Sequence, residues 1–220
     1  MIYALRSRLA SPDTLSRLQA LAEGAPASAP VSLRLELGRS STDWLHLLPG
    51  HLPSWYRARP DHHEFRLGIG HALHVGTAGP NRFGALDNAL SGFRQHWRRN
   101  GPALAFAGFA FDAANNTPLP NALLSIPAIL LENIAGNCSV TLTSAAGRLA
   151  QAAAEWAYWL SPSLTIETPR LLPSRPEPLA ERAWIARVNG ALRDIAAGSV
   201  DKVVLSRGRK FAASGPFSPA

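Results

Sequence analysis

Hydrophobic and polar residues alternate between residues 31 and 37, where valine or leucine takes every second position. This period of two predicts a β-strand with one buried face. Before it, residues 12–24 carry leucine at spacings of three after a Ser-Pro start and end on a glycine, which predicts a helix. Apolar residues at spacings of three and four between residues 83 and 97 predict a second amphipathic helix, closed by Gly101.

Apolar segments in the middle of the chain predict further strands. Residues 65–75 favour a strand or a hairpin, broken by two glycines. Residues 103–111 form a continuous apolar run, which is typical of a buried strand. Residues 123–131 form another, in which Pro127 predicts an edge position or a bulge because proline donates no backbone hydrogen bond. Residues 140–143 predict a short strand.

The last third of the chain predicts two more helices and a strand. Residues 149–160 carry a helical apolar stripe that a Ser-Pro pair stops, and residues 168–178 contain four prolines, as a linker does. Residues 184–195 form one helical face, and Gly198 fits the position after the helix end. Residues 202–206 predict a strand.

These elements divide the chain into three parts. We expect an N-terminal α+β region at residues 1–167, a proline-rich linker at 168–178 and a second region at 179–220. Strands and helices mix without a regular β-α-β alternation. The order therefore favours a mixed α/β or α+β protein over a doubly wound one.

Composition narrows the function classes. Apolar residues make up 46% and charged residues 17%, which suits a folded chain. The sequence shows no secretory signal, no run of roughly 18 apolar residues and only one cysteine, so we expect a cytoplasmic protein without a membrane span. The net charge is +7, but the arginines are scattered, with the densest group at Arg94, Arg98 and Arg99 beside Trp97. Scattered charge disfavours nucleic-acid binding and favours compositional bias.

Most candidate chemical groups have a simpler structural interpretation. His62-His63 and His71-x-x-His74 lack the cysteine cluster or further ligands that would complete a zinc site, so surface or core histidines are favoured. The pair of glycines at positions 68 and 70 lacks the third glycine of a phosphate loop. Cys138 is expected to be a small core residue.

Lys202 stands apart from these groups. It begins the predicted strand 202–206, and strand alternation places it on the same face as Val204 and Ser206. Partial burial would favour the neutral amine that a general base needs. The alternative is a lysine whose stem is buried and whose ammonium group reaches water.

The residues around Lys202 resemble the start of the chorismate-binding region of isochorismate synthases. That family shows a helix of the form Trp-x-x-x-Val with a later isoleucine, followed by Gly-x-x-x-Lys-Val-Val-Leu-Ser-Arg and a turn into the next helix. The matching positions are Trp184, Val188, Ile195, Gly198, Lys202-Val203-Val204-Leu205-Ser206-Arg207 and Gly215-Pro216-Phe217-Ser218-Pro219.

Two upstream segments extend the resemblance to about Trp55. Residues 107–112 are similar to the family's Gly-Gly-Phe-x-Phe-Asp strand, with alanine for the first glycine. Leu119-Pro120 and Ile126-Pro127 resemble the next family segment, although its tryptophan is missing. The resemblance implies the N-terminal part of the chorismate-utilising fold, an antiparallel-rich sheet flanked by helices, here incomplete.

The resemblance also implies a reaction. Isochorismate synthases add water at one ring carbon of chorismate while a hydroxyl leaves another, with Mg²⁺ holding the substrate. The lysine that matches Lys202 is the general base in that family, whereas related anthranilate synthases carry a neutral residue such as glutamine there. Lysine therefore favours the water-adding enzymes, which include salicylate synthases, and leaves open whether the product serves menaquinone or siderophore synthesis.

The family's general acid and Mg²⁺ ligands lie downstream of this motif, so we expect them to be absent from this chain. Glu132, Glu155 and Glu181 match no family motif and are not substitutes. Three explanations stay open: a truncated gene product, half of a split enzyme completed by a second polypeptide, or a domain kept for another role. A non-catalytic binding or regulatory module is the alternative to an isochorismate-synthase-like fragment inactive alone. A nucleic-acid-binding domain is the third hypothesis, and binding that weakens steeply with salt would distinguish it.

Overall fold

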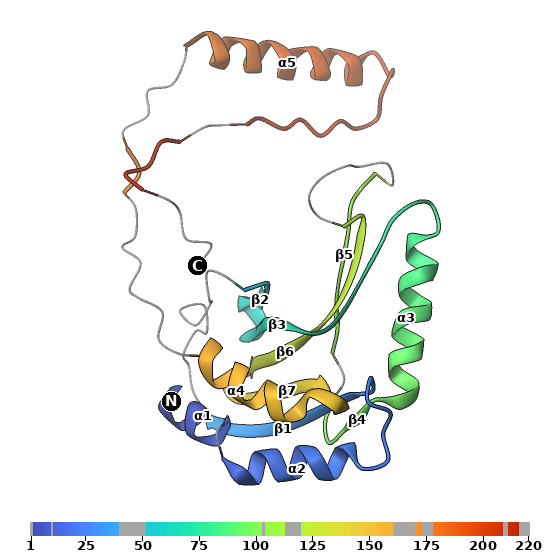
Figure 1. Cartoon of the computed structure of the whole chain (residues 1–220). Coiled ribbons are helices and arrows are strands. Elements are labelled where there is room, and N and C mark those ends of the chain that lie inside the picture. Colours follow the sequence, from blue (N-terminus) through green and yellow to red (C-terminus); the bar gives the residue numbers. More distant parts are fainter. Residues whose placement is uncertain are drawn as a thin grey trace. The chain divides into compact units, whose positions relative to one another are not determined.

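The computed structural model describes residues 2–9, 11–39, 52–102, 104–112, 120–160, 170–172, 178–208 and 211–215 (Figure 1). The chain divides into two compact units, formed by residues 1–164 and by residues 165–219. Most of the predicted linker 168–178, and the Ser-Pro pair predicted to stop the preceding helix, lie outside the described residues. The predicted boundaries at 167 and 178 therefore stay predictions.

The first unit is built on one sheet, and the described residues contribute seven strands to it in the order β2-β3-β6-β7-β1-β4, with β5 also paired to β6. All neighbours are antiparallel except β1 and β4. This antiparallel-rich sheet with flanking helices confirms the predicted α+β class. The strands are β1 (Pro30–Arg39), β2 (Ser54–Arg59), β3 (Glu64–Thr77), β4 (Arg98–Arg99), β5 (Phe106–Phe109), β6 (Ala122–Ile134) and β7 (Asn137–Ala145).

Three helices cover one face of this sheet: α1 (Ile2–Leu9), α2 (Pro12–Ala22) and α4 (Leu149–Trp159) (Figure 1). The predicted start of α2 at Ser11-Pro12 is confirmed, and so is the alternating strand that became β1. Short 3₁₀ turns occupy Pro60–His62 and Ala146–Arg148. Cys138 is buried, as predicted. The fully buried side chains of this core include Leu5, Leu9, Leu18, Val31, Leu67, Ile69, Ile129, Leu131, Val140, Leu142 and Trp156.

A second, smaller core forms under α3 (Arg82–His96), where the C-terminal end of β3 pairs with the N-terminal end of β6 (Figure 1). Its buried residues are Leu86, Ala122 and Leu124. The prediction that this helix ends at Gly101 is wrong. Trp97 already has an extended backbone, and the next two residues pair with β1, so pairing with the sheet takes the chain out of the helix.

The prediction that glycines break the strand at residues 65–75 is also wrong, because β3 pairs with β6 from Glu64 to Thr77. Gly68 instead permits a close approach, since a Cβ there would lie 3.0 Å from atoms of Phe106 and of Pro127. The register shifts between His71 and Leu73, opposite Pro127. The proline therefore marks a bulge within a central strand, which confirms one of the two predicted alternatives and excludes the edge position.

The apolar run 103–111 is not a buried strand. Only Phe106–Phe109 pairs, as β5, and its described neighbour in the sheet is β6 alone. Phe109 is 51% exposed, and Phe111 is fully exposed. An apolar run predicts burial only if a second layer covers it, and among the described residues Phe83 of α3 covers Phe109 only in part while Phe111 stays fully exposed.

In the second unit, α5 (Pro178–Ala196) and the positive φ of 71° at Gly198 confirm the predicted helix and its end. Beyond Gly198 the chain turns back and runs alongside α5 (Figure 1). The predicted strand 202–206 is wrong, because a strand requires a paired neighbour and these residues pair with no described strand. No helix in the described part of the chain has both the length and the apolar character needed to cross a membrane.

Candidate functional site

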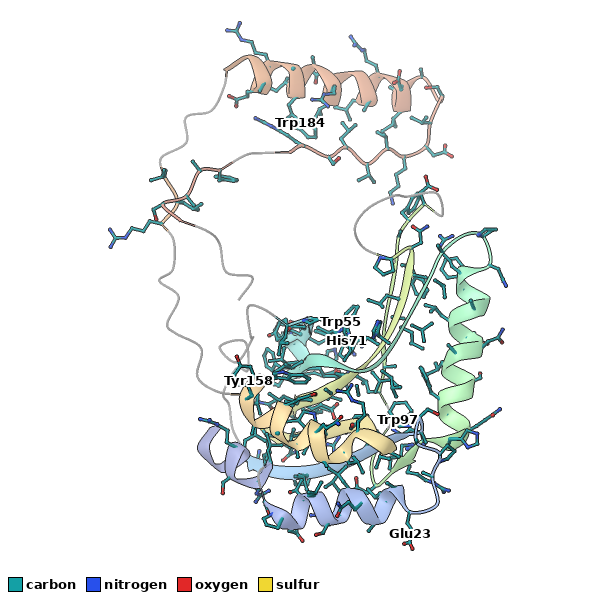
Figure 2. The ribbon with its side chains drawn as sticks, viewed as in Figure 1. Glu23, Trp55, His71, Trp97, Tyr158 and Trp184 are labelled. Carbon is teal, nitrogen blue, oxygen red and sulfur yellow. The ribbon has the colours of Figure 1, made fainter. Side chains whose placement is uncertain are left out.

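The segment that carries Lys202 lies against α5. Together they line an open pocket of about 370 Å³. Figure 2 shows Trp184 on the side of α5 that faces this returning segment, and the Arg187 guanidinium lies 5.8 Å from the centre of its ring. The pocket is lined by Arg187, Gly190, Ala191, Asp194, Val200, Val203 and Leu205.

The returning segment keeps the side-chain alternation that the sequence predicted. Val203 and Leu205 line the pocket beside α5, whereas Val204 is 82% exposed. Lys202 is exposed as well and does not line the pocket. The amine of Lys202 is therefore not buried by the described residues, because α5, the only described element beside the segment, contacts its opposite face. Its role as general base stays a prediction.

Glu132 is held in a structural ion network. On one side Arg66 Nε donates to Glu132 Oε1 at 2.9 Å, and on the other Arg34 Nη1 donates to Oε2 at 2.7 Å. Glu36 and Glu64 pair with the outer sides of the two arginines. Burial of Arg34 works against its charged form, but the hydrogen bonds and charges of Glu36 and Glu132 outweigh burial and raise the pKa of the guanidinium.

Glu155 and Glu181, the other two glutamates that match no family motif, lie at the surface. Glu155 pairs with Arg148 at 3.1 Å on the surface, and Glu181 lies exposed in the first turn of α5. Within the described ranges, no three histidine, cysteine, aspartate or glutamate side chains gather as metal ligands would. The described residues therefore offer no ready-made cluster of protein ligands for Mg²⁺.

The bulge in β3 brings two histidines and a serine together. The rings of His71 and His74 have centroids 5.1 Å apart, and His71 Nδ1 lies 2.6 Å from the buried Ser125 Oγ. Burial, with the nearby His74, lowers the pKa of His71. On the neighbouring strand β2, the ring of Trp55 stacks on Phe106 with centroids 5.6 Å apart. His62 lies elsewhere, 3.0 Å from Arg59 Nη2.

Sequence reasoning missed Arg82, which is buried at the start of α3. The sequence carries a signal for it, because an arginine occupies the first turn of the helix, where an acidic residue is electrostatically favourable. The Arg94, Arg98 and Arg99 group, in contrast, lies exposed. Trp97 beside it donates from Nε1 to Ser32 Oγ at 2.8 Å, so the tryptophan serves packing between α3 and β1.

Comparisons with known proteins identify a family and show similarity to solved structures. The sequence pattern of a family described as chorismate binding enzyme matches residues 21–220, which begins earlier than the resemblance from about Trp55. No protein with curated annotation matches the chain. The solved structure of MenF, the menaquinone-specific isochorismate synthase from Escherichia coli, is similar with a TM-score of 0.49 and 18% identity. That match covers 80% of this chain and 41% of the MenF chain.

Proposed function

Because the chain belongs to the chorismate-binding enzyme family, we propose that it contributes to an isochorismate-synthase-type reaction on chorismate. The observation that carries this proposal is that the family match extends across the segment from Lys202 to Arg207. The amine of Lys202 lies exposed on the side of this segment away from α5, where a substrate has access. We also propose that the protein is located in the cytoplasm.

In the proposed reaction Lys202 is the general base. Its neutral amine takes a proton from water, the water oxygen bonds to one ring carbon, and the ring double bond shifts. The hydroxyl on another ring carbon then leaves with a proton from an acid on the opposite face. Lysine serves this step because an amine that is shielded from water is more easily neutral near pH 7.

The described residues do not supply two groups that this reaction needs, the metal ligands and the general acid. The described residues form no cluster of ligands for the Mg²⁺ that the family resemblance implies, so we derive no step through the metal. Glu132 is already bound by Arg34 and Arg66 and is not available as the acid. We therefore propose that further polypeptide beyond the residues described, such as a second chain, supplies the acid and the metal ligands and covers Lys202.

Exposed apolar side chains on the second unit support this partner. Ile185 and Leu192 on α5 are more than half exposed, and Val204 is exposed beside Lys202. A helix and one extended segment alone cannot bury such side chains from water. A polypeptide that carries the C-terminal half of a chorismate-binding enzyme would cover them and complete the site.

Chorismate turnover with chromatographic detection of isochorismate tests the proposal. We expect no product from this chain alone with Mg²⁺ and turnover once the completing polypeptide is added. Lys202→Ala and Lys202→Arg should each lower the rate by roughly 10²-fold or more, because arginine keeps the charge but cannot accept the proton. Arg193→Ala, an exposed change in the last turn of α5, is the matched control and should keep the rate.

The outcomes separate the hypotheses. Full activity in Lys202→Ala would reject Lys202 as the base. Turnover by the chain alone would show that these 220 residues supply every catalytic group. Chorismate binding measured by calorimetry, without turnover in any mixture, would indicate a binding or regulatory module instead.

A further inference from the structure

Arg82 is a buried cation at the positive end of a helix. It is the first residue of α3, a helix of 15 residues, and only 7% of its surface is exposed. The first turn of α3 contains no acidic residue. Because the N-terminus of a helix carries partial positive charge, an arginine there is electrostatically unfavourable unless an anion accompanies it.

The described contacts of Arg82 are with neutral groups. Nη1 lies 3.5 Å from the carbonyl oxygen of Gly79, and Nη2 lies 3.3 Å from that of Ala110. The guanidinium carbon lies 4.4 Å from the centre of the Phe83 ring. Nε is buried without a hydrogen-bond partner, and none of the ion pairs among the described residues includes Arg82.

This environment differs from that of the other partly buried arginines. Arg34 and Arg66 share the carboxylate of Glu132, so their charges are compensated. Arginine stays protonated in proteins, so Arg82 cannot relieve its burial by losing a proton. Burying a charge is costly unless it is paired, which leaves an unmet requirement for a negative group beside Arg82.

The helix itself offers further donors at the same place. Asn81, the residue before α3, makes no side-chain cap hydrogen bond, and the backbone N–H groups of Phe83 and Gly84 donate to no backbone carbonyl among the described residues. Free N–H groups at a helix N-terminus bind oxyanions, since they converge on one point and lie at the positive end of the dipole.

We propose that the N-terminus of α3 and Arg82 form a binding site for an oxyanion, a carboxylate or a phosphate group. The neighbouring surface suits an organic anion, because Phe83 and Phe109 are about half exposed and their rings lie 4.9 Å apart. The guanidinium fork would bind two oxygens of the ligand, and the amides of Phe83 and Gly84 would bind the third or the same oxygens. This site is independent of Lys202 and of the proposed reaction.

Nuclear magnetic resonance of the full ¹⁵N-labelled chain tests the site. We would titrate sodium phosphate and sodium benzoate separately at constant ionic strength and follow the amide signals of Phe83 and Gly84. We expect saturable shifts of these two signals. Arg82→Gln should weaken binding by roughly tenfold or more, because a charged hydrogen-bonding partner is lost. Arg94→Gln, an exposed change in the last turn of the same helix, should bind as the unchanged protein does.

The two ligands distinguish the source of the anion. Tighter binding of benzoate assigns the site to organic carboxylates held against the phenylalanines, and tighter binding of phosphate assigns it to phosphate groups. If Arg82→Gln fails to fold, as circular dichroism would show, Arg82→Lys decides, because it keeps the charge but loses the fork and should still weaken binding. Shifts that stay linear with concentration, or equal affinity in the Arg82 variants, would overturn the proposal.

Discussion

Arg34 on β1 reaches over β7 to Glu132 on β6, with Nη1 2.7 Å from Oε2. The strand between them permits this contact because Ser139 and Thr141, the β7 residues paired with Glu132 and Arg34, have short side chains. Arg66 on β3 binds the other carboxylate oxygen. Glu132 on β6 therefore links β1, which lies beyond β7, to β3, the other neighbour of β6. These side chains lie on the sheet face opposite the main core.

We expect Glu132→Gln to lower the free energy of unfolding by about 2 kcal/mol, because it leaves two partly buried guanidinium groups without their shared charge. The cost is smaller than for a fully buried pair, since the side chains of Arg34 and Arg66 still reach water. Urea unfolding followed by tryptophan fluorescence measures this. Glu155→Gln breaks only the surface pair with Arg148 and should change stability by less than about 0.5 kcal/mol. Equal effects of the two changes would contradict a structural role for Glu132.

Gly70→Ala should destabilise the first unit by about 2 kcal/mol or more, since φ at Gly70 is +63° and L-residues are strained there. A Cβ at this position would also lie 2.7 Å from the Trp159 ring, so α4 would have to shift. Thermal unfolding checks the prediction. Gly92→Ala in α3 is the control, because a Cβ meets nothing within 4 Å there and alanine should raise stability by up to about 1 kcal/mol.

His71 should make stability depend on pH. In the folded protein the pKa of His71 is lowered from its ordinary value of 6.5. Burial is the larger cause and the nearby His74 the smaller one. The unfolded chain therefore binds a proton at higher pH than the folded protein does. The contribution of His71 to stability is complete above pH 6.5 and is lost as the pH falls toward the folded pKa.

Urea unfolding between pH 7.5 and pH 5 checks this prediction for His71. His71→Gln should remove part of the loss of stability at acid pH, whereas His62→Gln should not, because His62 is exposed. A slope of stability against pH that is unchanged in His71→Gln would show that other groups cause it.

Lys202→Ala should leave folding unaffected, with a change in the free energy of unfolding below about 0.5 kcal/mol, because the side chain is exposed. Circular dichroism and urea unfolding of the variant measure this. The result matters for the catalytic test, since a loss of turnover in a folded variant reports on the amine and not on stability. A large loss of stability would instead indicate that Lys202 supports the second unit.

Local periodicity was sufficient to predict several elements. Local patterns predict the alternating apolar residues of β1, the leucine stripe of α2, and the helix α5 with Gly198 just beyond its end. Each depends on a pattern that the chain itself repeats every two or about 3.6 residues. The resemblance that pointed to Lys202 was also local, because a short run of consecutive residues carries it.

Tertiary contacts decided the rest. β3 continues through Gly68 because β6 pairs with it throughout, and α3 ends at His96 because the following residues pair with β1. The apolar segment after Lys202 stays unpaired because no described strand lies beside it.

Sequence alone indicated the helices α2 to α5, though not α1, together with the alternation of β1 and the place of the family motif. Only the tertiary structure decided that Glu132 is held by two arginines distant in sequence and that Arg82 is buried without a counter-charge. The physical reason is that periodicity is a property of neighbouring residues, whereas the burial and pairing of a charge depend on residues that only the folded chain brings together.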